Sequence, residues 1–164
     1  MSAQDSLTVL TYTQNAPPKV MAKQWLHLYQ QGPVWVRPMV LSGTLANGYL
    51  AWSCSEGDQQ RLAYVAALAV FFATFPLTLA HFEPGINGAC KWKVESLLAS
   101  DGFSLQASNG FPSPFRHSAT ESSKKWADSA SIAELVASWG RLNHVRWVMS
   151  LFAAAASGYA TFCF

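Results

Sequence analysis

Three long apolar runs, separated by polar segments, dominate the pattern of the chain. They cover about residues 34–54, 60–82 and 141–163. Each is close to the roughly 20 residues that a helix needs to cross the hydrocarbon core of a bilayer. The pattern predicts an all-α protein, an integral membrane helical bundle with three transmembrane helices. With 164 residues, the chain is expected to form a single domain.

The polar segments between these runs predict further elements. Residues 19–31 have apolar side chains at helical spacing, which predicts an amphipathic lead-in helix at the membrane interface or a helical extension of the first run. The short acidic segment 55–60 can only join antiparallel neighbours. Residues 83–138 are rich in Ser, Gly, Asn and Pro and are predicted to form a polar loop, with helical stretches near 91–100 and 120–138.

The distribution of lysine and arginine predicts the topology. Lys19 and Lys23 precede the first run, and five more lysines and arginines lie within residues 83–138. The 55–60 turn is acidic, and Arg61 follows it at the start of the next run. Because positive residues favour the cytosolic side, the N-terminus and the 83–138 loop are predicted to be cytosolic. The membrane is expected to be the endoplasmic reticulum or another endomembrane.

Composition narrows the classes of function. The chain is 51% hydrophobic and only 12% charged, about half the charged fraction of an ordinary soluble domain. A net charge of +2, with no basic run interleaved with aromatic residues, argues against a nucleic-acid partner. The three cysteines form no CxxC pair and no metal-ligand spacing with the four histidines, so no metal site is predicted.

Polar residues on the last apolar run form the main candidate site. Trp139, Asn143, Arg146 and Ser150 follow one another at i, i+4, i+7 and i+11 and therefore share one helix face. An arginine within an apolar run is costly unless it faces a partner or a cavity, which makes Arg146 a functional-site hypothesis. Two alternatives remain open. Arg146 can extend to lipid head groups, as Arg141 is expected to do, or the polar pair only ties helices together.

Polar positions also interrupt the first two runs. The small-residue segment Ser42–Gly48 suits close helix contact. Pro76 is expected to kink the second run, and the hydroxyl of Thr78 can satisfy a freed carbonyl. His81 and Glu83 follow at the end of that run. This histidine is either a solvated cap or a proton acceptor at the mouth of a cavity.

Three segments, in this order, resemble the DUF1772 membrane proteins, a family that includes the fungal anthrone oxygenases of polyketide pathways. They are PPKVMAKQWLHLYQQGPVW (17–35), FPLTLAHFEPGIN (75–87) and WGRLNHVRWVMSLFAAAASGY (139–159). Trp139 with Asn143 and Arg146 is the most specific part. Members usually have four membrane helices, and the resemblance implies that the first one is missing here, because residues 1–15 cannot span a bilayer. The family's Pro-Thr-Asn element is also altered, to Pro-Gly-Ile-Asn at residues 84–87.

The resemblance implies a cofactor-independent monooxygenase of fungal secondary metabolism. It would use molecular oxygen to convert an anthrone, or a related polyketide phenol, to a quinone. The sequence agrees in lacking GxGxxG, a His/carboxylate metal triad and CxxCH. Such a reaction needs a base, a donor for the enolate oxygen and an apolar slot.

Site residues can be assigned to these roles as a hypothesis. Arg146 and Asn143 supply the oxyanion donors, and His81 is the first choice for the base, with His144 as the alternative. The predicted substrate-binding residues are Trp25, Tyr29, Thr78, Asn87, Trp139 and His144, of which the two tryptophans would stack on a flat aromatic polyketide. Trp25 and Tyr29 can equally be interfacial anchors.

A second class of function remains open. The chain can be a non-catalytic membrane subunit or accessory protein of a biosynthetic complex. Its Ser42–Gly48 segment would then be the interface with a partner, in a homo- or hetero-oligomer.

Overall fold

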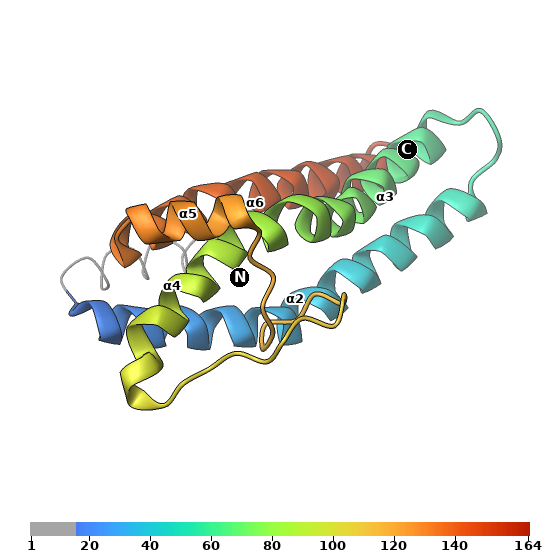
Figure 1. Cartoon of the computed structure of the whole chain (residues 1–164). Helices are drawn as coiled ribbons and strands as arrows, with labels where there is room; N and C mark the ends of the chain where they lie inside the picture. Colours follow the sequence, from blue (N-terminus) through green and yellow to red (C-terminus); the bar gives the residue numbers. More distant parts are fainter. Residues whose placement is uncertain (1–15) are drawn as a thin grey trace.

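The computed structural model describes residues 16–164, which form a helical bundle (Figure 1). The expected all-α fold is confirmed for this part of the chain, whose only β-pairing is an isolated bridge between Gln106 and Arg116. The elements in order are α2 (Pro18–Ser53), α3 (Gln59–Leu77), the π-helix η1 (Thr78–Asn87), α4 (Gly88–Leu98), the 3₁₀-helix η2 (Ala99–Asp101), α5 (Glu121–Ser129) and α6 (Ile132–Phe162).

Local sequence signals account for the helix starts. Pro18 occupies the first turn of α2, where its missing N–H costs nothing. Thr120 and Ser123 form a capping box at the start of α5. Ser131 and Glu134 form a second capping box at the start of α6. Each capping box satisfies two backbone N–H groups that would otherwise lack a partner.

The three long helices α2, α3 and α6 lie side by side, with α3 antiparallel to the other two (Figure 1). At the tip of the α2–α3 turn, the side chains of α3 bind the last turn of α6. The Nε2 of Gln60 donates to the carbonyl of Ala160 at 3.0 Å, and the hydroxyls of Tyr64 and Thr161 are 3.0 Å apart. These two hydrogen bonds hold the C-terminal turn of α6 against the start of α3.

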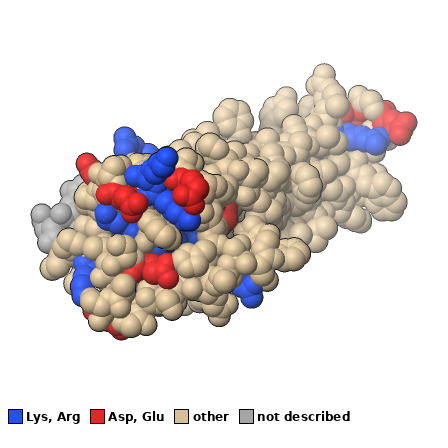
Figure 2. All heavy atoms as spheres, viewed as in Figure 1, with Lys and Arg blue, Asp and Glu red and all other residues tan. Residues whose placement is uncertain are grey.

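The surface is divided along the length of the bundle. On the face shown in Figure 2, charged side chains gather at the end that contains α4 and α5 and at the tip of the α2–α3 turn, with a long uncharged stretch between them. Within residues 16–164, the helical run Gln59–Asp101 contains the one stretch that is long and apolar enough to cross a membrane. The arrangement with three membrane-spanning helices therefore stays a prediction.

The structure decides one open alternative and moves one boundary. The lead-in segment and the first apolar run form one continuous helix, α2, so the segment is the predicted helical extension rather than a separate interfacial helix. Residues 83–138, predicted as a polar loop with helical stretches near 91–100 and 120–138, are largely helical, and α6 already begins at Ile132 rather than near 141. The reason is burial: residues of this segment at helical spacing enter the main core, namely Ile86, Ala89, Cys90, Val94 and Leu98. The non-helical loop is confined to residues 102–120.

The Ser42–Gly48 segment packs against a helix of the same chain. A Cβ at Gly43 would lie 3.2 Å from the ring of Phe71 on α3, and one at Gly48 would lie 3.8 Å from Leu68. Buried Asn47 donates to the carbonyl of Gly43 at 2.8 Å, within its own helix. Small residues thus bring α2 close to α3, as helix packing in membranes favours.

Replacing Gly88 by alanine is expected to destabilise the fold by about 1–3 kcal/mol, the usual cost of overpacking. A Cβ at Gly88 would lie 2.8 Å from the Cα of Ala119, a backbone atom that cannot move independently. Unfolding in detergent measures the effect. Gly158→Ala is the matched control, because a Cβ at Gly158 meets nothing within 4 Å. Equal stability of the two variants would contradict the close contact between α4 and the loop.

Candidate functional site

A distortion of the helical run after α3 creates the centre of the site. The run passes through the π-helix η1, and its backbone leaves helical geometry at Gly85, with φ −86° and ψ −107°. Pro84, just before this kink, has no N–H to continue the ladder. Such π-helical stretches are frequent at functional sites. Here the distortion accompanies a carboxylate, Glu83, that is buried in the bundle.

Glu83 is the acceptor in a buried polar network. Its Oε2 accepts from the hydroxyl of Tyr29 at 2.6 Å and from the Nδ2 of Asn87 at 3.0 Å. Its Oε1 accepts from the Nζ of Lys91 at 2.6 Å. The network continues to α6, because the indole N–H of Trp139 donates to the Oδ1 of Asn87 at 3.1 Å. The Glu83 network, as we call these five residues, therefore joins α2, η1, α4 and α6.

The Glu83 network lies at the charged end of the bundle, outside the three apolar runs. The side chains of Lys91 and Glu83 are only 1% and 7% exposed. Burial by itself raises the pKa of Glu83, but the Lys91 ammonium and three hydrogen bonds outweigh burial, so this pKa lies below its usual value. Burial and the neighbouring carboxylate raise the pKa of Tyr29, so its phenol stays protonated and donates. Glu83 is consequently ionised, and the ammonium of Lys91 balances its charge.

Aromatic rings cover one side of the Glu83 network. Trp25 stacks on Tyr29 with ring centroids 4.9 Å apart. Its ring also meets Trp139 in an edge-to-face contact at 6.0 Å. Trp25 is fully buried, and its indole nitrogen has no hydrogen-bond partner in the described part of the chain. The structure thus brings together four of the predicted substrate-binding residues, Trp25, Tyr29, Asn87 and Trp139, as packed core side chains.

Lys91 also ties the 102–120 loop to the helices. Besides binding Glu83, its ammonium donates to the carbonyls of Ser113 at 3.1 Å and Arg116 at 2.7 Å. The hydroxyl of Ser118 donates to the carbonyl of Glu83 at 3.0 Å. The loop is therefore fixed against η1 and α4 by the same residues that form the network.

Arg146 and Asn143 form a second polar group on α6. The guanidinium of Arg146 donates to the Oδ1 of Asn143 and lies over the ring of Phe82, 5.2 Å from its centroid. The Nδ2 of Asn143 is buried and has no partner among residues 16–164. This amide is a donor that remains available for a ligand oxygen.

The other predicted site residues lie apart from this pair. His81 is exposed, with its ring against Phe82 at 5.7 Å between centroids. His144 is half-buried on α6. The hydroxyl of Thr78 donates to the carbonyl of Thr74 at 2.7 Å, inside its own helix. The structure brings neither histidine into hydrogen-bond contact with Asn143 or Arg146 in the part it describes.

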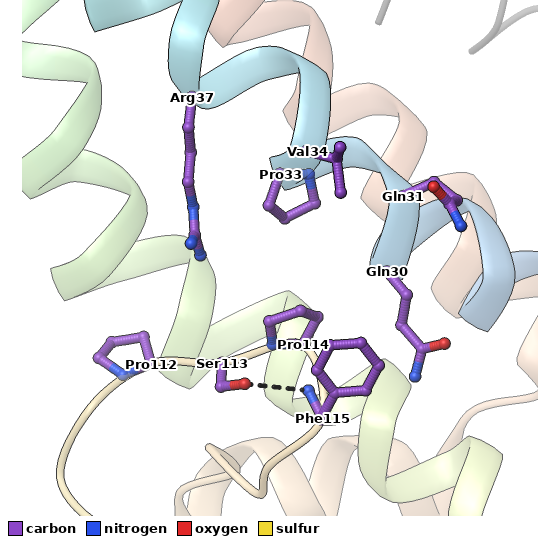
Figure 3. Close-up of a pocket in the computed structure, with 9 residues that line it drawn as sticks. All are labelled: Gln30, Gln31, Pro33, Val34, Arg37, Pro112, Ser113, Pro114 and Phe115. Carbon is purple, nitrogen blue, oxygen red and sulfur yellow. Dashed lines mark hydrogen bonds between the residues drawn. The ribbon is translucent and has the colours of Figure 1, made fainter.

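Two open grooves lie on the surface of the described chain. The first, which we call the His81 groove, has a volume of about 310 Å³. Its lining includes His81, Phe82, Thr120, Trp126 and Leu142. The second, the Arg37 groove, has a volume of about 440 Å³ and lies between α2 and the 102–120 loop (Figure 3). The His81 groove places the first-choice base beside Phe82, on whose ring the guanidinium of Arg146 rests.

Two residues of the site were not predicted from the sequence, Lys91 and the ionised Glu83. The sequence places Glu83 beside His81 and Lys91 among the basic residues of the predicted loop, without indicating that they meet. The available signal was their spacing: positions 83, 87 and 91 recur every four residues, which aligns them on one helix face. In residues 16–164, no group of three His, Cys, Asp or Glu side chains could hold a metal ion.

Together these features define an all-helical protein with extended apolar helices and a polar interior at one end. The chain belongs to the anthrone oxygenase family, whose family model matches residues 25–156. The match contains every predicted site residue, from Trp25 to Arg146, and confirms the resemblance noted from the sequence. No curated protein and no solved structure matches the chain significantly.

Proposed function

We propose that this protein is an integral membrane enzyme that oxidises an anthrone, or a related polyketide phenol, to a quinone with molecular oxygen and no cofactor. The observation that carries the proposal is the Asn143–Arg146 pair, inside the family match and on an apolar helix. Arg146 forms no ion pair with a carboxylate in the described chain, and the buried amide of Asn143 has a free donor. Both donors suit an oxygen that becomes negative during a reaction.

The chemistry requires only a base and donors. The methylene of an anthrone lies between two aryl rings and is conjugated to a carbonyl, so removal of its proton gives a stabilised enolate. The enolate passes one electron to oxygen, and the resulting radical and superoxide combine to a hydroperoxide. Loss of water then gives the quinone, so one anthrone and one oxygen molecule yield one quinone and one water. Asn143 and Arg146 would bind the enolate oxygen throughout.

The His81 groove is our choice for the substrate. Asn143 and Arg146 do not line it, but Phe82, which contacts the Arg146 guanidinium, and Leu142, which precedes Asn143, do, so binding of the enolate oxygen requires the two donors to turn toward the groove. Phe82 and Trp126 offer ring surfaces for a flat molecule, and His81, which also lines the groove, would accept the methylene proton. In this structure the rings of Trp25 and Trp139 are buried against each other and against Tyr29. Their proposed role therefore shifts from stacking on the substrate to supporting the helices that carry Asn143 and Arg146.

Oxygen-dependent turnover tests the proposed activity. The chain is produced in yeast microsomes, supplied with emodin anthrone under air or argon, and assayed for anthraquinone. The expected result is formation above the spontaneous rate of empty-vector microsomes, under air only. Removal of metals by a chelator and of soluble cofactors by washing should leave the rate unchanged. A rate equal to that of the empty-vector membranes, from well-inserted protein, would contradict the proposal.

His81→Ala is expected to lower turnover about 10²-fold, the lower end of what a general base contributes, because an exposed base can be replaced in part by buffer. His144→Ala is the matched comparison, since it removes the alternative base from α6. The measurement is the rate in membranes at matched protein levels, with imidazole added to rescue the alanine variant. A full rate for His81→Ala and a loss for His144→Ala would transfer the role of base to His144.

The alternative function, a non-catalytic subunit, has less support from the fold. Its expected interface was the Ser42–Gly48 segment, and Gly43 and Gly48 of that segment face α3 of the same chain. The proposed location is an endomembrane with the N-terminus and the polar end of the bundle in the cytosol. Lys19 and Lys23 at the start of α2, and the basic residues that follow the apolar part of the Gln59–Asp101 run, support this orientation.

A further inference from the structure

The Arg37 groove is a cleft at the boundary between the charged end and the apolar part of the bundle. Figure 3 shows the side chain of Arg37 extending from α2 into the space between the helix and the loop. Across from it lie Pro112, Ser113, Pro114 and Phe115 of the 102–120 loop, and Gln30 and Gln31 add two amides. No Asp or Glu is among the lining residues. The groove therefore combines a cation, amide donors and apolar walls, without a negative charge of its own.

The loop wall of the groove is held in place. Lys91 donates to the carbonyls of Ser113 and Arg116, and the N–H of Phe115 donates to the hydroxyl of Ser113 at 3.3 Å (Figure 3). Because Lys91 is itself bound to buried Glu83, the position of this wall is set by the core. Arg37, in contrast, makes no ion pair within residues 16–164, so its guanidinium can bind an anionic ligand.

The apolar face that continues from the groove indicates the occupant. Val34, Arg37, Leu41 and Leu45 are spaced i, i+3, i+7 and i+11 and share one face of α2. The three apolar members are 59%, 52% and 64% exposed. An exposed apolar stripe that continues from a cation through Leu41 and Leu45 matches an amphiphile with an anionic head and hydrocarbon tails. A guanidinium binds phosphate well because it can donate two parallel hydrogen bonds to two phosphate oxygens.

We propose that the Arg37 groove binds the phosphate head group of an anionic membrane phospholipid, with its acyl chains along Leu41 and Leu45. The site goes beyond the proposed oxygenase reaction and rests only on the membrane insertion proposed with it. Gln30 and Gln31 face the ester and glycerol oxygens, and Phe115 covers the head group. The bound lipid thereby joins α2 to the loop that Lys91 holds.

Lipid retention by the purified chain tests this site. The protein is extracted from membranes in mild detergent, incubated with phosphatidic acid or phosphatidylcholine, and analysed by native mass spectrometry. We expect one retained phosphatidic acid per chain and preference over phosphatidylcholine. Arg37→Gln should lower retention about tenfold, as expected for loss of a charge-assisted bond. Arg37→Lys should keep much of it, since the charge remains.

Matched controls separate this site from general attraction and from misfolding. Arg141→Gln removes an exposed arginine of α6 whose side chain donates to Ser138 and makes no ion pair within residues 16–164, and should leave retention unchanged. Equal retention by Arg37→Gln and wild type would overturn the proposal, as would an equal loss in Arg141→Gln. Complete displacement of the lipid by inorganic phosphate would show a small-anion site and would overturn it too. Anthrone turnover is not used in this test, so its outcome is independent of the proposed reaction.

Discussion

Arg146→Ala is expected to lower anthrone turnover by about 10²–10³-fold, the loss that follows removal of one preorganised oxyanion donor. The variant removes the guanidinium over Phe82 and leaves the Oδ1 of Asn143 without its donor. The fall should appear in kcat, because the enolate charge develops only during the reaction. The measurement is anthraquinone formation in microsomes at matched levels of inserted protein.

Two further variants define what Arg146 contributes. Arg146→Lys keeps the charge but loses the planar fork, so an intermediate rate is expected. Arg141→Ala removes the neighbouring exposed arginine and should retain the wild-type rate, because among the described residues its side chain donates only to Ser138. Full turnover by folded Arg146→Ala would refute the assignment and would leave the Asn143–Arg146 pair with a purely structural role.

Lys91→Met is expected to destabilise the fold by about 3–5 kcal/mol, the usual effect of removing one partner of a buried ion pair. The ionised Glu83 would remain in the core without its cation, and the carbonyls of Ser113 and Arg116 would lose a donor. The 102–120 loop should also become sensitive to protease. Denaturant unfolding in detergent and limited proteolysis measure the two effects. Lys125→Met, at an exposed lysine, is the control and should change neither.

A second substitution distinguishes the lost charge from lost packing. In Glu83→Gln with Lys91→Met, no buried charge remains unpaired, so the double variant should be more stable than Lys91→Met alone. The amide can still accept from Tyr29 and Asn87. If the double variant were less stable than either single variant, Lys91 would act mainly through the loop carbonyls rather than through Glu83.

The apolar pattern predicted the helices well because long apolar runs leave few alternatives. The pattern underestimated how much of the segment after Phe82 packs into the core, because its apolar residues are diluted by Lys91, Lys93 and Glu95. The sequence predicts a helical stretch near 91–100, but it does not show that Val94 and Leu98 pack into the main core. The boundary of α6 was misplaced for a similar reason, since Glu134 in its first turn interrupts the apolar pattern but belongs to a capping box.

The candidate site was only partly predictable. The spacing of Trp139, Asn143 and Arg146 places them on one helix face independently of the tertiary structure. In the structure, Arg146 and Asn143 of this face are hydrogen-bonded to each other. The partner of Trp139 is Asn87, 52 residues away, and spacing alone does not reveal a contact over that distance. The ionisation of Glu83 depends on four elements meeting at the kink near Gly85, which is a property of the tertiary structure.

The bonds from Gln60 and Tyr64 to the last turn of α6 have a practical consequence for locating the chain in a cell. They place the C-terminal turn beside the turn that joins α2 and α3, at the same end of the bundle. A reporter fused after Phe164 therefore reports the compartment that contains both the C-terminus and the α2–α3 turn. In the proposed membrane arrangement, a glycosylation acceptor engineered between Cys54 and Asp58 gives the same answer, and the two signals together orient the three long helices.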